Sequence, residues 1–167
     1  ATATLLGLAP LVQKHLINVK SIIVDAKSGT SGAGKKLSAS THFTEANDNL
    51  QIYKPNHHQH IPEIVQELQK WDPSVTTLQF MTTLIPVTRG IMSTIYAQVS
   101  PGVDEQTLLA AFPDTYDDQP FVNFTATDLP TIKQVVGTNN CDIGIAYNPE
   151  TQFVMVDSVI DNMLKGA

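Results

Sequence analysis

Three histidines lie within four residues of this chain, at His57, His58 and His60. Imidazole is the side chain whose ordinary pKa puts a proton in exchange near neutral pH. Glu63 follows His60 by three residues, a spacing at which a carboxylate can orient an imidazole and hold its tautomer. The spacing predicts a proton-transfer site in which His60 is the general acid or base and Glu63 orients it.

The residue types leave two other interpretations of this cluster open. The histidines are solvated loop residues without a role, or His58, His60 and Glu63 are metal ligands. A zinc site wants three or four ligands, whereas the chain has one cysteine and no His-Glu-x-x-His motif. We therefore expect no metal. A non-enzymatic metal- or anion-binding domain built on His58 and His60 remains the alternative to an enzyme.

A predicted helix over residues 62–71 follows the histidines directly. Pro62 suits its first turn, where the missing N–H would have no partner. Ile64, Leu68 and Trp71 recur at the spacing of one apolar helix face. A short apolar stretch over 50–53 predicts a strand on the other side. The histidines are therefore expected on a short connection that leads directly into a buried helix. Such a connection would fix the position of a proton-transfer group.

The rest of the chain alternates short apolar stretches with turn residues. The pattern predicts helices over 1–15, 105–112 and 157–165, and strands over 21–26, 75–85, 89–99, 116–124, 131–136, 141–147 and 152–158. The strands follow one another without regular helical crossovers. This order predicts a single α+β domain over residues 1–167, with a mixed, mostly antiparallel sheet and helices packed on one face.

Two further motifs carry possible chemistry. Residues 29–35 have the G-x-x-x-x-G-K spacing of a phosphate loop, but Lys36 stands where Ser or Thr should bind magnesium, and no amphipathic helix follows. The segment is either a flexible loop or one that turns backbone N–H groups and lysines toward an anionic ligand.

The chain has one cysteine, Cys141. It precedes Asp142, which would raise the pKa of its thiol. We predict a buried, unreactive cysteine.

Composition narrows the class of protein. A length of 167 residues suits one domain with a real core. The net charge of −6 argues against a nucleic-acid or anionic-membrane partner. No apolar run approaches the roughly 18 to 20 residues of a membrane span. A single cysteine forms no internal disulfide, which fits a cytoplasmic location.

Four motifs together resemble the catalytic, C-terminal domain of N-acetyl-gamma-glutamyl-phosphate reductase, in the glyceraldehyde-3-phosphate dehydrogenase-like C-terminal domain superfamily. They run in the family's order along nearly the whole chain: DAKSGTSGAG at 25–34, HQHIPEI at 58–64, PVTRGI at 86–91 and GTNNCDIG at 137–144. A related semialdehyde dehydrogenase of the same superfamily, acting on another acid, is the nearest alternative.

The resemblance implies an NADP-dependent reductase of arginine biosynthesis. In that family a cysteine attacks the acyl phosphate of N-acetylglutamyl phosphate, phosphate leaves, and NADPH reduces the thioacyl enzyme to the semialdehyde. By resemblance, His60 is the acid or base, with Glu63 beside it, and His58 lies next to the substrate. By the same resemblance, Lys27, Ser28 and Arg89 are secondary candidates for polar contacts on the substrate side.

The chain departs from the family's pattern at several points. The family's cysteine is expected two residues before Ala1, and its Rossmann domain precedes that, so we expect a domain excised from a longer chain and inactive alone. NADP would be bound mainly by that other domain, and the family implies a homo-oligomer. His57 stands where the family usually has glycine, and Gln59 where it often has arginine, which puts an anionic contact in doubt.

Overall fold

The computed structural model describes residues 1–166, which form one mixed sheet with helices packed against it. The spatial order of the strands is β2-β3-β1-β4-β7-β6-β5. Their bounds are β1 (Ile23–Ser28), β2 (Gln51–Tyr53), β3 (Gln79–Leu84), β4 (Ile91–Gln98), β5 (Val122–Thr125), β6 (Cys141–Asn148) and β7 (Phe153–Ile160).

Most neighbouring strands run antiparallel. The antiparallel pairs are β2–β3, β1–β4, β4–β7 and β6–β7. The pairs β1–β3 and β5–β6 are parallel. The predicted α+β class with a mixed, mostly antiparallel sheet is confirmed. The turn at 149–152 joins β6 to β7 as an antiparallel hairpin, where strands over 141–147 and 152–158 were predicted.

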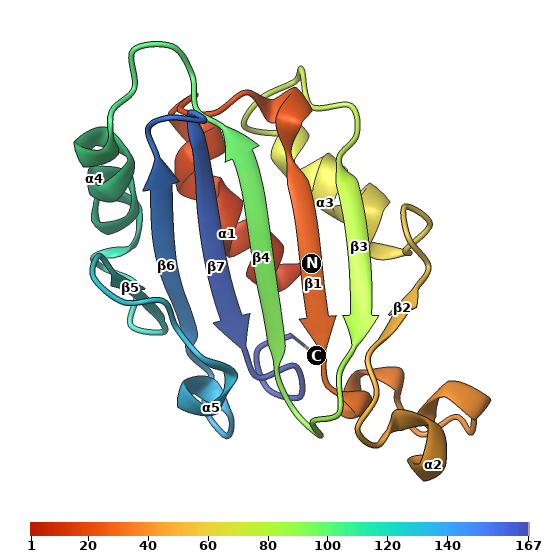
Figure 1. The fold of residues 1–167 in the computed structure, drawn as a ribbon. Helices are drawn as coiled ribbons and strands as arrows, with labels where there is room; N and C mark the ends of the chain where they lie inside the picture. The colour runs from red at the N-terminus through yellow and green to blue at the C-terminus, as the bar shows by residue number, and fades with distance from the viewer. Residues whose placement is uncertain (167) are drawn as a thin grey trace.

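Three longer helices cover one face of the sheet: α1 (Thr2–Gln13), α3 (His60–Gln69) and α4 (Glu105–Tyr116). Figure 1 looks onto the opposite face, with α1 and α3 behind the strands. The short elements are η1 (Val19–Ser21), η2 (Thr30–Ala33), η3 (Ala39–Thr41), α2 (Phe43–Ala46) and α5 (Ile132–Val135). No helix within residues 1–166 is long and apolar enough to cross a membrane.

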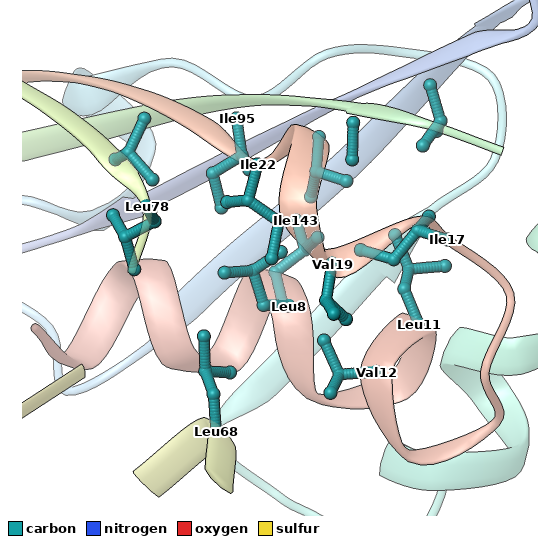
Figure 2. Close-up of a cluster of buried hydrophobic side chains, with 14 of the residues drawn as sticks. Leu8, Leu11, Val12, Ile17, Val19, Ile22, Leu68, Leu78, Ile95 and Ile143 are labelled. Carbon is teal, nitrogen blue, oxygen red and sulfur yellow. The ribbon is translucent and has the colours of Figure 1, made fainter. Parts of the chain in front are cut away.

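The core lies between α1 and the sheet. Leu8, Leu11 and Val12 of α1 are fully buried and pack with Ile95 of β4 and Ile143 of β6 (Figure 2). One polar contact crosses this layer, between the hydroxyls of Thr4 and Ser93, at 2.9 Å. Because α1 is buried along most of its length, its first turn is held rigidly against the strand ends, where a site can use it.

Two predicted elements are wrong. The predicted strand over 131–136 is the helix α5, because Thr131 and Gln134 form a capping box that satisfies the first-turn N–H groups. The predicted helix over 157–165 does not form. Instead β7 continues to Ile160, because it pairs along its whole length with both β4 and β6. A strand buried on both faces has a continuous apolar run, which periodicity cannot distinguish from a buried helix.

The chain after β7 is organised by one buried carboxylate, Asp161. It accepts hydrogen bonds from the backbone N–H groups of Gly137 and Met163, at 2.8 Å each, and its Oδ2 lies 2.9 Å from Nη2 of Arg89. Burial opposes ionisation of Asp161, but the two N–H donors and Arg89 hold its pKa below the ordinary value. The ionised Asp161 thereby fixes the position of the next residue, Asn162.

Candidate active site

A cavity of about 740 Å³ opens where the first turn of α1, the end of β1 and the histidine segment meet. Its polar lining is dominated by hydroxyl groups. These belong to Thr2, Thr4, Ser28, Ser31, Ser38, Ser40, Thr41, Tyr53 and Thr82. Lys54 contributes a positive charge at the wall. Such a lining offers many hydrogen-bond donors to an oxygen-rich, anionic molecule.

His58 and His60 both line this cavity. Their ring centroids are 4.8 Å apart. The His58 ring also contacts Tyr53 at 5.8 Å and Phe80 at 5.6 Å between centroids. The backbone N–H of His60 donates to Nδ1 of His58, at 3.3 Å. His58 is therefore held in an aromatic cage, and its Nδ1 is an acceptor, which leaves the proton on Nε2.

Both imidazoles are neutral at pH 7. Partial burial lowers the pKa of His58 to about 4, and the neighbouring His60 and Lys54 add to this. Burial also lowers the pKa of His60, while Glu63 partly opposes that shift. A neutral imidazole facing a cavity is ready to accept a proton.

The other predicted site residues divide between the cavity and other locations. Ser28 lines the cavity. Lys27 points to the opposite face of the sheet, where its Nζ lies 2.6 Å from Asp25. Arg89 is engaged with Asp161. Glu63 is exposed, and within residues 1–166 it is not hydrogen-bonded to His60, so its effect on the imidazole is electrostatic. The structure brings His58, His60 and Ser28 together, and not Lys27, Arg89 or Glu63.

Comparison with known proteins identifies the family of this chain. The model of the semialdehyde dehydrogenase dimerisation domain matches residues 1–162. The chain belongs to that family. Over its full length it is 62% identical to N-acetyl-gamma-glutamyl-phosphate reductase of Limosilactobacillus fermentum. It is 56% identical to N-acetyl-gamma-glutamyl-phosphate reductase 2 of Lactiplantibacillus plantarum. The chain spans about half the length of these relatives, 49% in each case.

Solved structures agree on the fold of this dimerisation domain. Aspartate semialdehyde dehydrogenase II from Vibrio cholerae superposes with a TM-score of 0.72 at 17% identity, over 99% of this chain and 56% of that one. A probable aspartate-semialdehyde dehydrogenase from Pseudomonas aeruginosa gives 0.71 at 19% identity, over 96% and 55% of the two chains. At these identities the likeness concerns the fold alone.

In this member of the family, Asn56 anchors the histidine segment to β3. Its backbone N–H donates to the carbonyl of Phe80, at 2.8 Å, and its Oδ1 accepts from the N–H of Phe80, at 2.9 Å. Its φ of 56° lies in the left-handed region, which asparagine tolerates better than most residues. Because the Phe80 ring touches His58, this two-bond clamp ties the imidazoles to the sheet.

We predict that Asn56→Ala lowers the free energy of unfolding by about 1 to 2 kcal/mol, since it removes a hydrogen bond and strains a left-handed residue. Denaturant unfolding measures this, and the NMR signals of the His58 ring protons should shift as its aromatic cage loosens. Asn56→Asp keeps an acceptor oxygen and is the matched control, with less than half the loss. Equal stability of wild type and Asn56→Ala would contradict the clamp.

Sequence reasoning missed two parts of the cavity wall. The first turn of α1, residues 1–4, lines the cavity beside the histidines. Asn162 also lines it, donating from Nδ2 to Ser31, at 3.0 Å, and accepting from the N–H of Gly90, at 2.7 Å. No local pattern marks Asn162, because its role depends on β7 ending beside the loop after β1.

The loop after β1 is confirmed to lack the context of a nucleotide phosphate loop, because it leads into the one-turn η2 and not a helix. The N–H groups of Thr30 and Ser31 donate to the carbonyls of Val87 and Thr88. Gly29 is needed for this approach, since a Cβ there would lie 2.8 Å from the Thr88 carbonyl oxygen. These bonds hold the loop against the β3–β4 connection, with residues 31–34 facing the cavity.

Cys141 is buried, as predicted, and packs beside Ser158. Burial raises the pKa of its thiol to about 11, so it is protonated and unreactive at neutral pH. Within residues 1–166, no group of three His, Cys, Asp or Glu side chains is placed to hold a metal ion. The chemistry that the described residues offer is proton transfer by imidazole and hydrogen bonding by hydroxyls.

Proposed function

We propose that this chain is the substrate-binding, catalytic and oligomerisation domain of an NADP-dependent N-acetyl-gamma-glutamyl-phosphate reductase. One observation carries the proposal. Two imidazoles that are neutral at pH 7 face a hydroxyl-lined cavity, in a chain 62% identical over its whole length to a reductase of that name. A cytoplasmic location and a place in arginine biosynthesis belong to the same proposal.

In this proposal His60 moves the proton at the carbonyl oxygen of the substrate. His60 first takes the proton of the attacking cysteine thiol, which lies elsewhere in the full-length protein. As the general acid it then gives that proton to the oxygen of the thiohemiacetal, and as the base it takes the proton back when the semialdehyde forms and the thiolate leaves. His58 cannot replace it easily, because its Nδ1 already accepts from the His60 backbone. Glu63, three residues after His60, favours the cationic form of the imidazole that this exchange produces.

The substrate is held by the polar wall of the cavity. Ser31 and Tyr53 offer hydroxyl donors, and Lys54 offers a positive charge to an acyl phosphate or carboxylate. The hydroxyl of Ser28 donates to the Gly29 carbonyl, at 3.2 Å, so Ser28 offers its oxygen as an acceptor. Burial raises the pKa of Tyr53, so its phenol stays protonated and able to donate at neutral pH. A neutral base surrounded by donors suits a substrate that is itself anionic.

The residues described here do not fit a dinucleotide. The glycine loop after β1 uses its N–H groups at Thr30 and Ser31 internally and opens no helix that could face a pyrophosphate. NADP, which supplies the hydride in such reductases, is therefore proposed to bind mainly through other residues of the full-length protein.

The domain is also proposed to assemble into a homo-oligomer. The family's description names it a dimerisation domain. The long helices cover one sheet face, while Ile23 and Tyr96 remain exposed on the other, at 45% and 38% of their surface. An uncovered sheet face with large exposed side chains suits a second copy of the same chain.

The test is an assay of the full-length protein with N-acetylglutamyl phosphate and NADPH, following NADPH oxidation and phosphate release together. We expect equal amounts of both. Aspartyl phosphate is the competing substrate, and a preference for it would replace the proposal with an aspartate-type semialdehyde dehydrogenase. Absence of NADPH oxidation with either acyl phosphate would overturn a reductase altogether.

A further inference from the structure

Two serines at the end of β1 and in the loop after it line the cavity, and their hydroxyl groups are used differently. The hydroxyl of Ser28 donates to the carbonyl of Gly29, at 3.2 Å, so its hydrogen is used inside the chain. The hydroxyl oxygen of Ser31 accepts from Nδ2 of Asn162, at 3.0 Å, and this is the one hydrogen bond of that side chain within residues 1–166. The hydrogen of the Ser31 hydroxyl is therefore available to a molecule in the cavity.

The direction of the bond between Asn162 and Ser31 is fixed at the other end of the amide. The backbone N–H of Gly90 donates to Oδ1 of Asn162, at 2.7 Å. Because an N–H group can only donate, the amide oxygen must face Gly90, and the NH₂ group must face Ser31. An amide NH₂ group does not accept, so the Ser31 hydroxyl accepts on this side and points its hydrogen away from Asn162.

Both residues of this bond are held in place by the backbone. β1 and β7 are each antiparallel to β4, so they end at the same edge of the sheet, the lower edge in Figure 1. The N–H of Ser31 donates to the carbonyl of Thr88, at 3.0 Å. Asn162 is 6% exposed and follows Asp161, whose carboxylate accepts from two backbone N–H groups. The Ser31 hydroxyl is thus ordered before a ligand enters, which reduces the entropy lost on binding.

A hydroxyl hydrogen that faces a cavity suits an oxygen that can only accept. Carboxylate and phosphoryl oxygens are such acceptors, and hydrogen bonds to charged oxygens are stronger than neutral ones. The chain carries a net charge of −6, and Lys54 is the one lysine or arginine among residues 1–166 that lines the cavity. An anion in this cavity therefore depends on neutral donors such as the Ser31 hydroxyl as well as on Lys54.

We propose that Asn162 is a positioning residue, which orients the Ser31 hydroxyl so that this group donates to an anionic oxygen of the acyl phosphate substrate. The inference rests on the proposed function for the nature of that substrate. The anionic oxygen belongs to the phosphoryl group or to the carboxylate of the substrate, and the same chemistry binds either. The amide oxygen of Asn162 stays engaged with Gly90, so Asn162 acts through Ser31.

Calorimetry on the full-length protein tests this orientation, with inorganic phosphate and N-acetylglutamate as separate probes for the phosphoryl group and the carboxylate. Ser31→Ala should weaken the binding of one probe by about tenfold or more, since a hydrogen bond to a charged oxygen is lost. Asn162→Ala should weaken the same probe by about threefold or more, because the hydroxyl is then free to rotate. The double variant should bind like Ser31→Ala alone, because Asn162 acts through that hydroxyl.

Asn162→Asp is a second variant, which keeps the size of the side chain and the acceptor for Gly90 if Asn162→Ala does not fold by circular dichroism. Its carboxylate accepts from the Ser31 hydroxyl and so turns the hydrogen away from the cavity. We expect binding of the probe to weaken by about tenfold or more. The loss should be smaller when Asn162→Asp is introduced into Ser31→Ala, where only the added negative charge acts.

In the reductase assay, Ser31→Ala and Asn162→Ala should raise KM for the acyl phosphate by about tenfold and threefold, and change kcat less, because the contact is already made in the bound substrate. The matched control is Asn148→Ala. Asn148 is an exposed asparagine that accepts from the backbone N–H of Glu150 at the opposite end of β7 and does not line the cavity. Its replacement should leave the binding of both probes unchanged.

Three results would count against the inference. If the losses of Ser31→Ala and Asn162→Ala multiply in the double variant, Asn162 does not act through Ser31. If Ser31→Ala binds both probes as wild type does, or if wild type binds neither, the hydroxyl holds no anion. The proposed reductase is judged separately by turnover of the wild type, so a protein without turnover whose calorimetry shows the expected losses keeps the oriented serine and loses the proposed function.

Discussion

His60→Ala is expected to lower kcat of the proposed full-length reductase by about 10² to 10⁴, the range over which a positioned acid or base contributes. His60 is the better candidate for the acid or base, because it lines the cavity, whereas Nδ1 of His58 already accepts a hydrogen bond from the His60 backbone. KM should change little, since the proton transfer occurs in the transition state and not in substrate binding. Steady-state kinetics with saturating NADPH measure both constants.

The matched control is His57→Ala, because His57 is exposed and does not line the cavity. Its kcat should stay within about threefold of wild type. The pH dependence of kcat is a second test of His60. Because burial holds its pKa below the ordinary value of a histidine, His60 loses its activity as a base only as the pH falls below that ordinary value. A loss of less than about threefold in His60→Ala would remove this residue from the mechanism.

Asp161→Ala is expected to cost about 2 to 4 kcal/mol of unfolding free energy. The fully buried carboxylate accepts from two backbone N–H groups, of Gly137 and Met163, which would be left without that acceptor. Arg89 would lose its partner too, but it is partly exposed and water replaces some of that contact. Asp114→Ala, at an exposed ion pair, is the control and should cost under about 1 kcal/mol.

The carboxylate of Asp161 also makes the free energy of unfolding depend on pH. Its pKa is depressed in the folded state, so its contribution is present above the ordinary pKa of an aspartate and is lost as the pH falls through the folded value. Asp157, whose pKa is raised, acts in the opposite direction. The difference between wild type and Asp161→Asn isolates the first effect. That difference should shrink on acidification below about pH 4, and a constant difference would contradict the ionised carboxylate.

The strands and helices that could be predicted were those with a strong local signal. The helix carrying the histidines has a proline start and a regular apolar face, and it forms from His60. By contrast, β7 is buried on both faces from Val156 to Ile160, so this stretch merged with residues 161–165 into a false helix. The strand predicted over 131–136 failed because the capping box of Thr131 and Gln134 outweighs β propensity in so short a segment.

By itself, the sequence determined the α+β class, the histidine pair and the burial of Cys141, because these depend on local periodicity, motif spacing and residue type. Only the tertiary structure decided toward which face of the sheet each side chain points and what lies on that face. Ser28 and Lys27 are neighbours, yet the alternation of β1 sends Ser28 to the cavity and Lys27 to the open sheet face. Which of the two faces holds the cavity depends on where α1 and α3 pack. The proton-transfer site and the Lys27–Asp25 ion pair therefore lie on opposite faces of β1. The packing of helices that are distant in the sequence decides which face becomes the cavity wall.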